Sequence, residues 1–312
     1  MKATNNNNNS VNIYELVTER IIEQMQNGLI PWRRPWNVAK MTGKDTAINY
    51  VTRHAYSPLN QMLLGEAGEY LTFKQVTELK GKVKAGAHSR LVVFYKPQVC
   101  TREKTTTDEN GNEKTVKEQF TIPYLQYYRV FHLNDTEGIP SKITATEEVK
   151  PEPEQIIQTA EDVVLNYVTR EGIKFINNKP SNSAYYQPST DTVVLPQKKQ
   201  FKTIGAYYGT AFHELTHSTL TKNRCDRTEN GNATAAFGSQ VYSREELVAE
   251  IGSAMLCTAT GIDNTDIFEN SIAYLQSWIK ALKNDSKMIV WAAGRAEKAA
   301  KYIQGIKDTE NN

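Results

Sequence analysis

Five consecutive residues, His213 to His217, place two imidazoles and a carboxylate at the spacing of one helical turn. Side chains four positions apart lie on the same face of a helix, so His213 and His217 can bind one zinc ion together. Glu214 follows the first histidine, where its carboxylate can reach a water molecule bound to that ion. Bound zinc lowers the pKa of this water toward about 7 and polarises a carbonyl group. The motif therefore predicts metal-assisted hydrolysis with Glu214 as the general base.

A catalytic zinc site needs a third protein ligand and one open coordination position. The six residues after His217 contain no histidine, so we expect a carboxylate from the segment that begins at Ser243. Glu246 and Glu250 form the Glu-x-x-x-acid pattern of gluzincins, in which the first carboxylate binds zinc and the second orients a ligand. We favour this assignment, and the reverse stays open, because Glu250 lies nearer the apolar stripe and Ser243 with Glu246 also matches a helix capping box. Glu245 is expected to face solvent.

Helices must carry these residues, because the spacing of the motif brings its side chains together only on a helix. Apolar residues recur at helical spacing through most of the second half of the chain. The helices expected there cover residues 156–170, 201–222, 243–260, 266–284 and 286–306. Short strands are expected around residues 172–175 and 192–195. This half is therefore predicted to be mainly helical.

The first half combines helical and strand patterns. Apolar spacing predicts a helix from Ile13 that ends at Gly28, and Pro31 follows at the usual distance beyond a helix end. Asn110-Gly111 predicts the turn of a long exposed hairpin. The remaining elements expected here are a helix over residues 57–66 and strands over 91–95 and 124–131.

The two patterns together predict an α+β protein of two domains, with a mixed α/β domain followed by a mainly helical, gluzincin-type domain. The segment between them is rich in Pro, Glu, Thr and Lys and has few apolar residues, so few core contacts are expected to cross it. The expected divisions are a disordered arm (1–12), the first domain (13–140), a linker (141–155), the metal-bearing domain (156–306) and a tail (307–312).

The formal charge of the 312-residue chain is +2, too close to neutral to indicate a strongly basic nucleic-acid-binding protein. The distribution is uneven, since residues 1–104 hold 15 basic and 8 acidic residues, a local charge of +7, and the other residues carry −5. This asymmetry indicates an anionic partner for the basic half, although a solvated lysine-rich face gives the same count. Apolar runs fall short of the about 20 residues that span a bilayer, and the sequence has no signal-peptide pattern after Met1. The three cysteines form no CxxC pair, so we expect a cytoplasmic protein with no disulfides and no membrane contact.

The basic half contains residues suited to single-stranded DNA, which proteins hold by stacking bases on aromatic rings and by contacting phosphates with cations. Two prolines stiffen a short segment that supplies both kinds of group. The candidate DNA contacts are Trp32, Arg33, Arg34, Trp36, Lys82 and Lys84. Burial of the two tryptophans against the first helix is the alternative, because tryptophan is more often found in a core than on a platform.

Several blocks in a fixed order make the chain resemble the ArdC-type antirestriction proteins of conjugative plasmids and other mobile elements. The N-terminal blocks are residues 14–22, 28–36, 70–75, 81–86, 92–96 and 128–131. The C-terminal blocks are residues 184–191, 200–201, 207–208, 213–218, 243–252, 274–278 and 292–296. Two places depart from the usual pattern: Ser218-Thr219-Leu220 replaces a Trp-Thr-Gly type sequence, and Phe131-His132-Leu133-Asn134 replaces a Phe-Asn-Val type block.

The resemblance implies a domain that binds single-stranded DNA, followed by a zincin-like metallopeptidase domain. Proteins of this type protect incoming DNA from host restriction during conjugation, and the same N-terminal module occurs on plasmid primases. Carried over by residue, the ligands of one Zn²⁺, or of another divalent ion, are His213, His217 and Glu246, and Glu214 is catalytic.

Two functions follow from the resemblance. In the first, the protein protects DNA by binding it, and the metal site is structural or vestigial. In the second, the protein is an active zinc protease that cleaves a host protein, and DNA binding only targets it. A fragment of a plasmid primase is less consistent with the sequence, which lacks the acidic metal cluster of nucleotidyl transfer.

Overall fold

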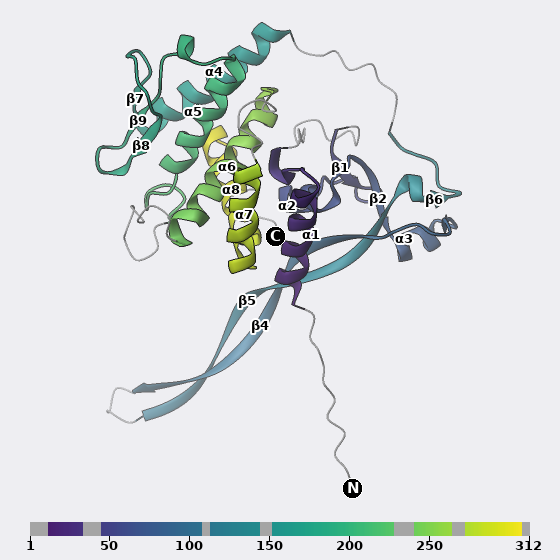
Figure 1. Cartoon of the computed structure of the whole chain (residues 1–312). Coiled ribbons are helices and arrows are strands. Elements are labelled where there is room, and N and C mark those ends of the chain that lie inside the picture. The colour runs from purple at the N-terminus through teal and green to yellow at the C-terminus, as the bar shows by residue number, and fades with distance from the viewer. Residues whose placement is uncertain are drawn as a thin grey trace.

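A computed structural model describes residues 12–33, 45–107, 113–143, 152–227, 240–263 and 272–307. The first half is built around a sheet and the second half is mainly helical, so the predicted α+β class and two-part organisation are confirmed (Figure 1). Among the helices of these residues, none has both the length and the apolar content that crossing a bilayer requires.

A four-stranded sheet in the order β1-β2-β5-β4 forms the centre of the first half. β1 and β2 are parallel, and the other neighbours are antiparallel. The strands are β1 (Ala47–Asn49), β2 (Gly68–Thr72), β4 (Arg90–Thr107) and β5 (Glu113–His132). A second, two-stranded sheet pairs β3 (Lys82–Val83) with β6 (Thr136–Glu137). The sequence did not predict β1 or β2, because both are short and lack clear alternation.

The predicted long hairpin is confirmed and is the most extended feature of the molecule. β4 and β5 pair continuously from Arg90 opposite Val130 to Thr107 opposite Glu113. Figure 1 shows the outer part of this ribbon projecting away from the rest of the protein. Asn110-Gly111 lies outside the described residues.

Helices of the first half begin where the sequence places caps. Asn12 accepts a hydrogen bond from the Tyr14 backbone at the start of α1 (Ile13–Gln26), and Ser57 precedes Pro58 in α2. Gly28 follows α1 with a positive φ of 77°, a conformation that favours glycine. The other helices here are η1 (Pro31–Arg33), α2 (Pro58–Leu64) and α3 (Phe73–Glu78).

The second half is mainly helical, and α5 (Ile204–Ser218) is the helix that carries the motif. The helices are α4 (Pro153–Glu171), α5, α6 (Gln240–Thr260), α7 (Ile272–Asn284) and α8 (Met288–Gln304). A small sheet in the order β7-β9-β8 lies against α5. Its strands are β7 (Lys174–Ile176), β8 (Tyr185–Gln187) and β9 (Thr192–Val194). The five predicted helices are therefore present with shifted ends, and β8 is a strand that the sequence did not predict.

One hydrophobic core extends across both halves, contrary to the expectation that few core contacts cross residues 141–155. Side chains of α1 and η1 share a buried cluster with α6, α7 and α8. Trp32, for example, is 1% exposed and meets the ring of Trp278 at 6.1 Å in an edge-to-face contact. Linker composition describes only the connection, whereas these contacts are made by segments far from it. The domain bounds themselves stay a prediction, since residues 1–11, 144–151 and 308–312 lie outside the described residues.

Candidate metal centre

The close packing of α5 against α6 brings the motif and its third carboxylate together. Gly252 allows the approach, because a Cβ atom built on it would lie 2.6 Å from the Cγ2 atom of Thr216 on α5. One residue further along α6, the Ser253 hydroxyl donates a hydrogen bond of 2.7 Å to the Gly209 carbonyl. These contacts fix the face of α6 that carries Glu246 against the histidine face of α5.

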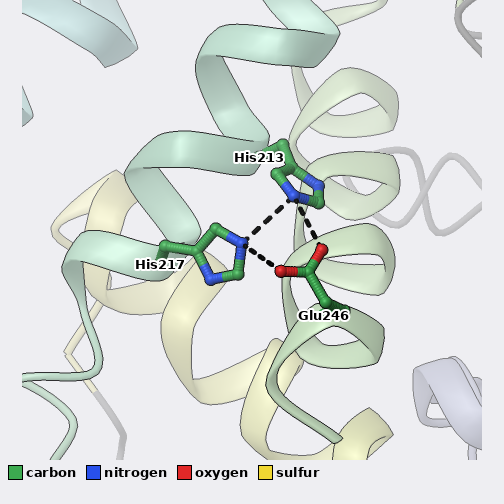
Figure 2. A group of neighbouring side chains, drawn as sticks. All are labelled: His213, His217 and Glu246. Atoms are coloured by element: carbon green, nitrogen blue, oxygen red, sulfur yellow. Dashed lines mark hydrogen bonds and ion pairs between the residues drawn. The ribbon is translucent and has the colours of Figure 1, made fainter. Parts of the chain in front are cut away.

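The three side chains converge on one point, as Figure 2 shows. His213 Nε2 lies 3.1 Å from His217 Nε2 and 3.5 Å from Glu246 Oε2. His217 Nε2 lies 3.5 Å from Glu246 Oε1. A tetrahedral zinc ion with bonds of about 2.1 Å separates its ligand atoms by about 3.4 Å. The triangle of donor atoms therefore fits one face of such a coordination sphere.

Negative charge surrounds the imidazoles. Burial lowers the pKa of His213, but the nearby carboxylates of Glu246, Glu214 and Glu250 have the larger effect and raise this pKa to about 9. Glu214 is itself buried at 8% exposure, next to His213 on α5. The site thus has the electrostatic character that stabilises a bound cation.

Glu245 contacts the Nδ1 atom of His217, so the expectation that Glu245 faces solvent is wrong. Its Oε1 lies 3.4 Å from His217 Nδ1, on the side of the ring opposite the convergence point. Arg227 donates hydrogen bonds of 2.6 and 3.0 Å to the two oxygens of Glu245. Burial raises the pKa of Glu245, but the hydrogen bonds from Arg227 and His217 lower it more strongly, so the carboxylate stays charged. Carboxylates in this position fix the orientation and increase the basicity of a metal-binding histidine.

Glu250 lies one turn beyond Glu246, buried at 6% exposure, and is not part of the converging group. Its Oε2 is 3.9 Å from Nη2 of Arg33. The Arg33 guanidinium also lies over the ring of Tyr274, 4.6 Å from its centroid. The geometry therefore favours Glu246 over Glu250 as the third ligand.

The capping-box alternative for Glu246 is also removed. α6 begins at Gln240, so Ser243 lies inside the helix, where its backbone N–H is no longer at an uncapped end. The carboxylate of Glu246 points to the two histidines instead.

The structure corrects two of the predicted DNA contacts. Trp32 and Arg33 are 1% and 8% exposed, so neither side chain is accessible to a DNA strand in this conformation. The tryptophan packs on α7 rather than on the first helix alone. Arg34 and Trp36 lie outside the described residues.

Lys82 and Lys84 are exposed, as a contact with DNA requires. Lys84 Nζ donates a hydrogen bond of 2.7 Å to the Asn134 carbonyl, which holds this side chain at the surface. Their role in DNA binding stays a prediction.

Comparison with known proteins agrees with both halves of the architecture. Residues 11–131 match the family described as the N-terminal domain of anti-restriction factor ArdC, and residues 164–295 match the zincin-like metallopeptidase family. The metal-free crystal structure of the antirestriction protein ArdC from plasmid R388 is 31% identical, has a TM-score of 0.65, and is matched over 95% of this chain and 98% of that one. The chain belongs to the ArdC family. The Mn(II)-bound structure of the R388 protein matches with a TM-score of 0.66 at 29% identity, over 96% of this chain and 100% of that one.

Other relatives of this ArdC-family chain include larger proteins. The y4eC protein of Sinorhizobium fredii is 30% identical over 310 residues, which cover 96% of this chain and 94% of that protein. Two DNA primases TraC of Escherichia coli are 32% and 30% identical, each over 95% of this chain. The chain spans only 27% and 20% of their lengths. Together with the converging donor atoms, the zincin-like match and the Mn(II)-bound ArdC structure support a divalent metal ion at the candidate centre.

Proposed function

We propose that this ArdC-family protein protects incoming DNA from restriction by binding it as a single strand, and that it carries a zinc metallopeptidase-type site. The observation that carries the metal assignment is the triangle of donor atoms from His213, His217 and Glu246. The basic N-terminal half and the match of residues 11–131 to the ArdC N-terminal domain support the DNA assignment.

In this proposal each side chain has a separate task. His213, His217 and Glu246 hold the ion, and Glu214 accepts a proton at its carboxylate as general base. When bound, zinc lowers the pKa of a water ligand and polarises a carbonyl group. Glu245 keeps the His217 ring in place through Nδ1, and Arg227 keeps Glu245 charged.

Proteolysis of a host protein is the second candidate function. The observation that favours it is the presence of Glu214, buried beside the ligand triangle, in addition to a complete set of ligands. A structural metal site needs ligands but has no use for a general base. DNA binding would then bring the protease to its target.

Glu214→Ala separates the two candidates, with His213→Ala as the metal-binding control. Both variants and the wild type are measured for metal content, for binding to oligo-dT, and for protection of plasmid DNA transferred into a restricting host. Protection that survives Glu214→Ala supports protection by binding, and its loss with metal content unchanged supports proteolysis. A wild type that contains no metal after loading contradicts the metal assignment, and one that does not bind oligo-dT contradicts the DNA assignment.

A further inference from the structure

The two faces of the β4–β5 hairpin differ in chemistry. Residues directly opposite in an antiparallel pair lie on the same face, and the register here has no bulge. Alternate residues of β4 and their partners on β5 therefore form one continuous face. We call it the aromatic face and define it by Phe94, Lys96, Arg102, Lys104, Phe120 and Tyr124.

Aromatic rings on this face are exposed to solvent. Phe94, Phe120 and Tyr124 are 39%, 37% and 50% exposed. The opposite face has two exposed rings, those of Tyr95 and Tyr127, which lie opposite the buried Leu125 and Val93 at the base of the hairpin. A projecting ribbon cannot bury such rings in the body of the protein, so their apolar surface is available to a ligand.

Cations alternate with these rings. Lys96 lies directly opposite Tyr124, and the Arg102 guanidinium lies 5.3 Å from the centroid of the Phe120 ring. Three cations and one carboxylate lie on the aromatic face between residues 94–105 and 115–126. The carboxylate is that of Glu118, which forms a salt bridge of 2.8 Å with Arg102, so this face keeps a net charge of +2. On the opposite face of that length, Glu103 and Lys117 face each other and cancel. Positive charge and exposed rings thus occur on the same side of the ribbon.

The edges of the hairpin are unsuited to pairing with another strand. Pro97 and Pro123 lie opposite each other in the ladder. Neither has a backbone N–H, so each outer edge lacks a donor at its middle. Prolines at this position discourage strand addition by a second copy, which leaves the side-chain face as the binding surface.

We propose that the aromatic face binds a single-stranded nucleic acid, with bases stacked on its rings and phosphates held by its cations. The proposal rests on the proposed single-strand binding of this protein and assigns it to a surface outside the segment around Trp32. Residues 94 to 104 span about 33 Å at the rise of a β-strand, which accommodates several nucleotides. Rings can stack on any base and cations can contact any phosphate, so this face suits binding that is tolerant of sequence.

Two double variants of the full chain test the assignment. Lys96→Ala/Tyr124→Ala removes one cation and one ring from the aromatic face. Tyr95→Ala/Lys117→Ala removes the same two residue types from the opposite face, and all four side chains are exposed. Binding to fluorescent oligo-dT is measured by anisotropy over a range of salt concentrations, and circular dichroism checks the fold of each variant.

We expect the aromatic-face variant to bind at least about five-fold more weakly, with a salt slope less negative by about 0.7. The control should stay within about two-fold of the wild type, since it removes no stacked ring. Photocrosslinking of an iodouracil-substituted strand to the wild type should modify the peptide that contains Phe120 and Tyr124.

Equal effects of the two variants, or none from either, would overturn the assignment while leaving single-strand binding intact. A wild type that dimerises in sedimentation analysis, and that Lys96→Ala/Tyr124→Ala converts to a monomer, would show that the face binds a second copy instead. If the wild type itself does not bind oligo-dT, the proposed DNA binding fails together with this assignment.

Discussion

Replacing Glu245 by glutamine tests whether the carboxylate next to His217 Nδ1 increases the affinity of the site for a metal ion. The substituted glutamine keeps the shape of the side chain but loses the charge that faces His217 Nδ1 at 3.4 Å. Loss of such a supporting carboxylate weakens metal binding by about 10- to 100-fold, or about 1.4–2.7 kcal/mol. We therefore expect the dissociation constant for Zn²⁺ or Mn²⁺ of Glu245→Gln to rise by this factor, measured by competition with a chromophoric chelator.

Stability has to be separated from metal affinity, because Glu245 also pairs with Arg227, whose side chain is 1% exposed. Glu171→Gln is a matched control at a carboxylate that is not part of the metal-binding group. Its side chain is 13% exposed, close to the 18% of Glu245, and it accepts a hydrogen bond from Arg224, whose side chain is 6% exposed. Each substitution weakens hydrogen bonds to a buried guanidinium and should lower the free energy of unfolding of the metal-free protein by about 1–3 kcal/mol.

The two variants should differ only in metal binding. A dissociation constant for Glu245→Gln within two-fold of the wild type would refute the positioning role of this carboxylate. So would an equal loss of metal affinity in Glu171→Gln, because general loosening of the fold would then explain both.

Three further outcomes follow from the packing and charges. Gly252→Ala should lower the free energy of unfolding by about 1–3 kcal/mol, because the added Cβ atom would clash with Thr216. Gly294→Ala on α8 should raise the free energy of unfolding by about 0.5–1 kcal/mol, because nothing lies within 4 Å of the added Cβ atom. Urea unfolding of the two variants measures both changes. Trp32→Ala should lower the free energy of unfolding by about 3–5 kcal/mol, and the protein should still unfold in one thermal transition. A variant that loses DNA affinity but no stability would contradict the burial of Trp32. Burial raises the pKa of Glu171, but its hydrogen bonds lower it more, so the pKa lies below 4.5 in the folded protein. The charged Glu171 carboxylate therefore stabilises the fold fully above pH 4.5, and this stabilisation is lost as the pH falls below 4.5. The difference in free energy of unfolding between the wild type and Glu171→Gln should shrink in acid.

The part of the centre that could be predicted from sequence is the part that depends on local geometry. His213, Glu214 and His217 lie within one helical turn, so their spacing alone places them on one face. Glu246 required a choice between carboxylates, and the choice depended on where α6 begins. A start at Gln240 instead of Ser243 removes the competing capping role.

Glu245 and Trp32 show what sequence could not provide. The burial of Glu245 depends on Arg227, which reaches it from the segment after α5, and no motif marks that arginine. The burial of Trp32 depends on Trp278, which is far away in the chain. A stiff, aromatic and basic segment has the same composition whether its rings stack on bases or pack into a core, and only the tertiary partner distinguishes the two.

The core that α1 and η1 share with α6, α7 and α8 also limits how genes for such proteins can recombine. A crossover within residues 141–155 would join an N-terminal region to a foreign helical half that lacks the surface around Trp278. Apolar side chains of both parents would then be exposed, and the recombinant would aggregate. Exchange that keeps the protein folded must move both halves as one block, which agrees with the way a DNA primase TraC matches 95% of this chain, across both halves.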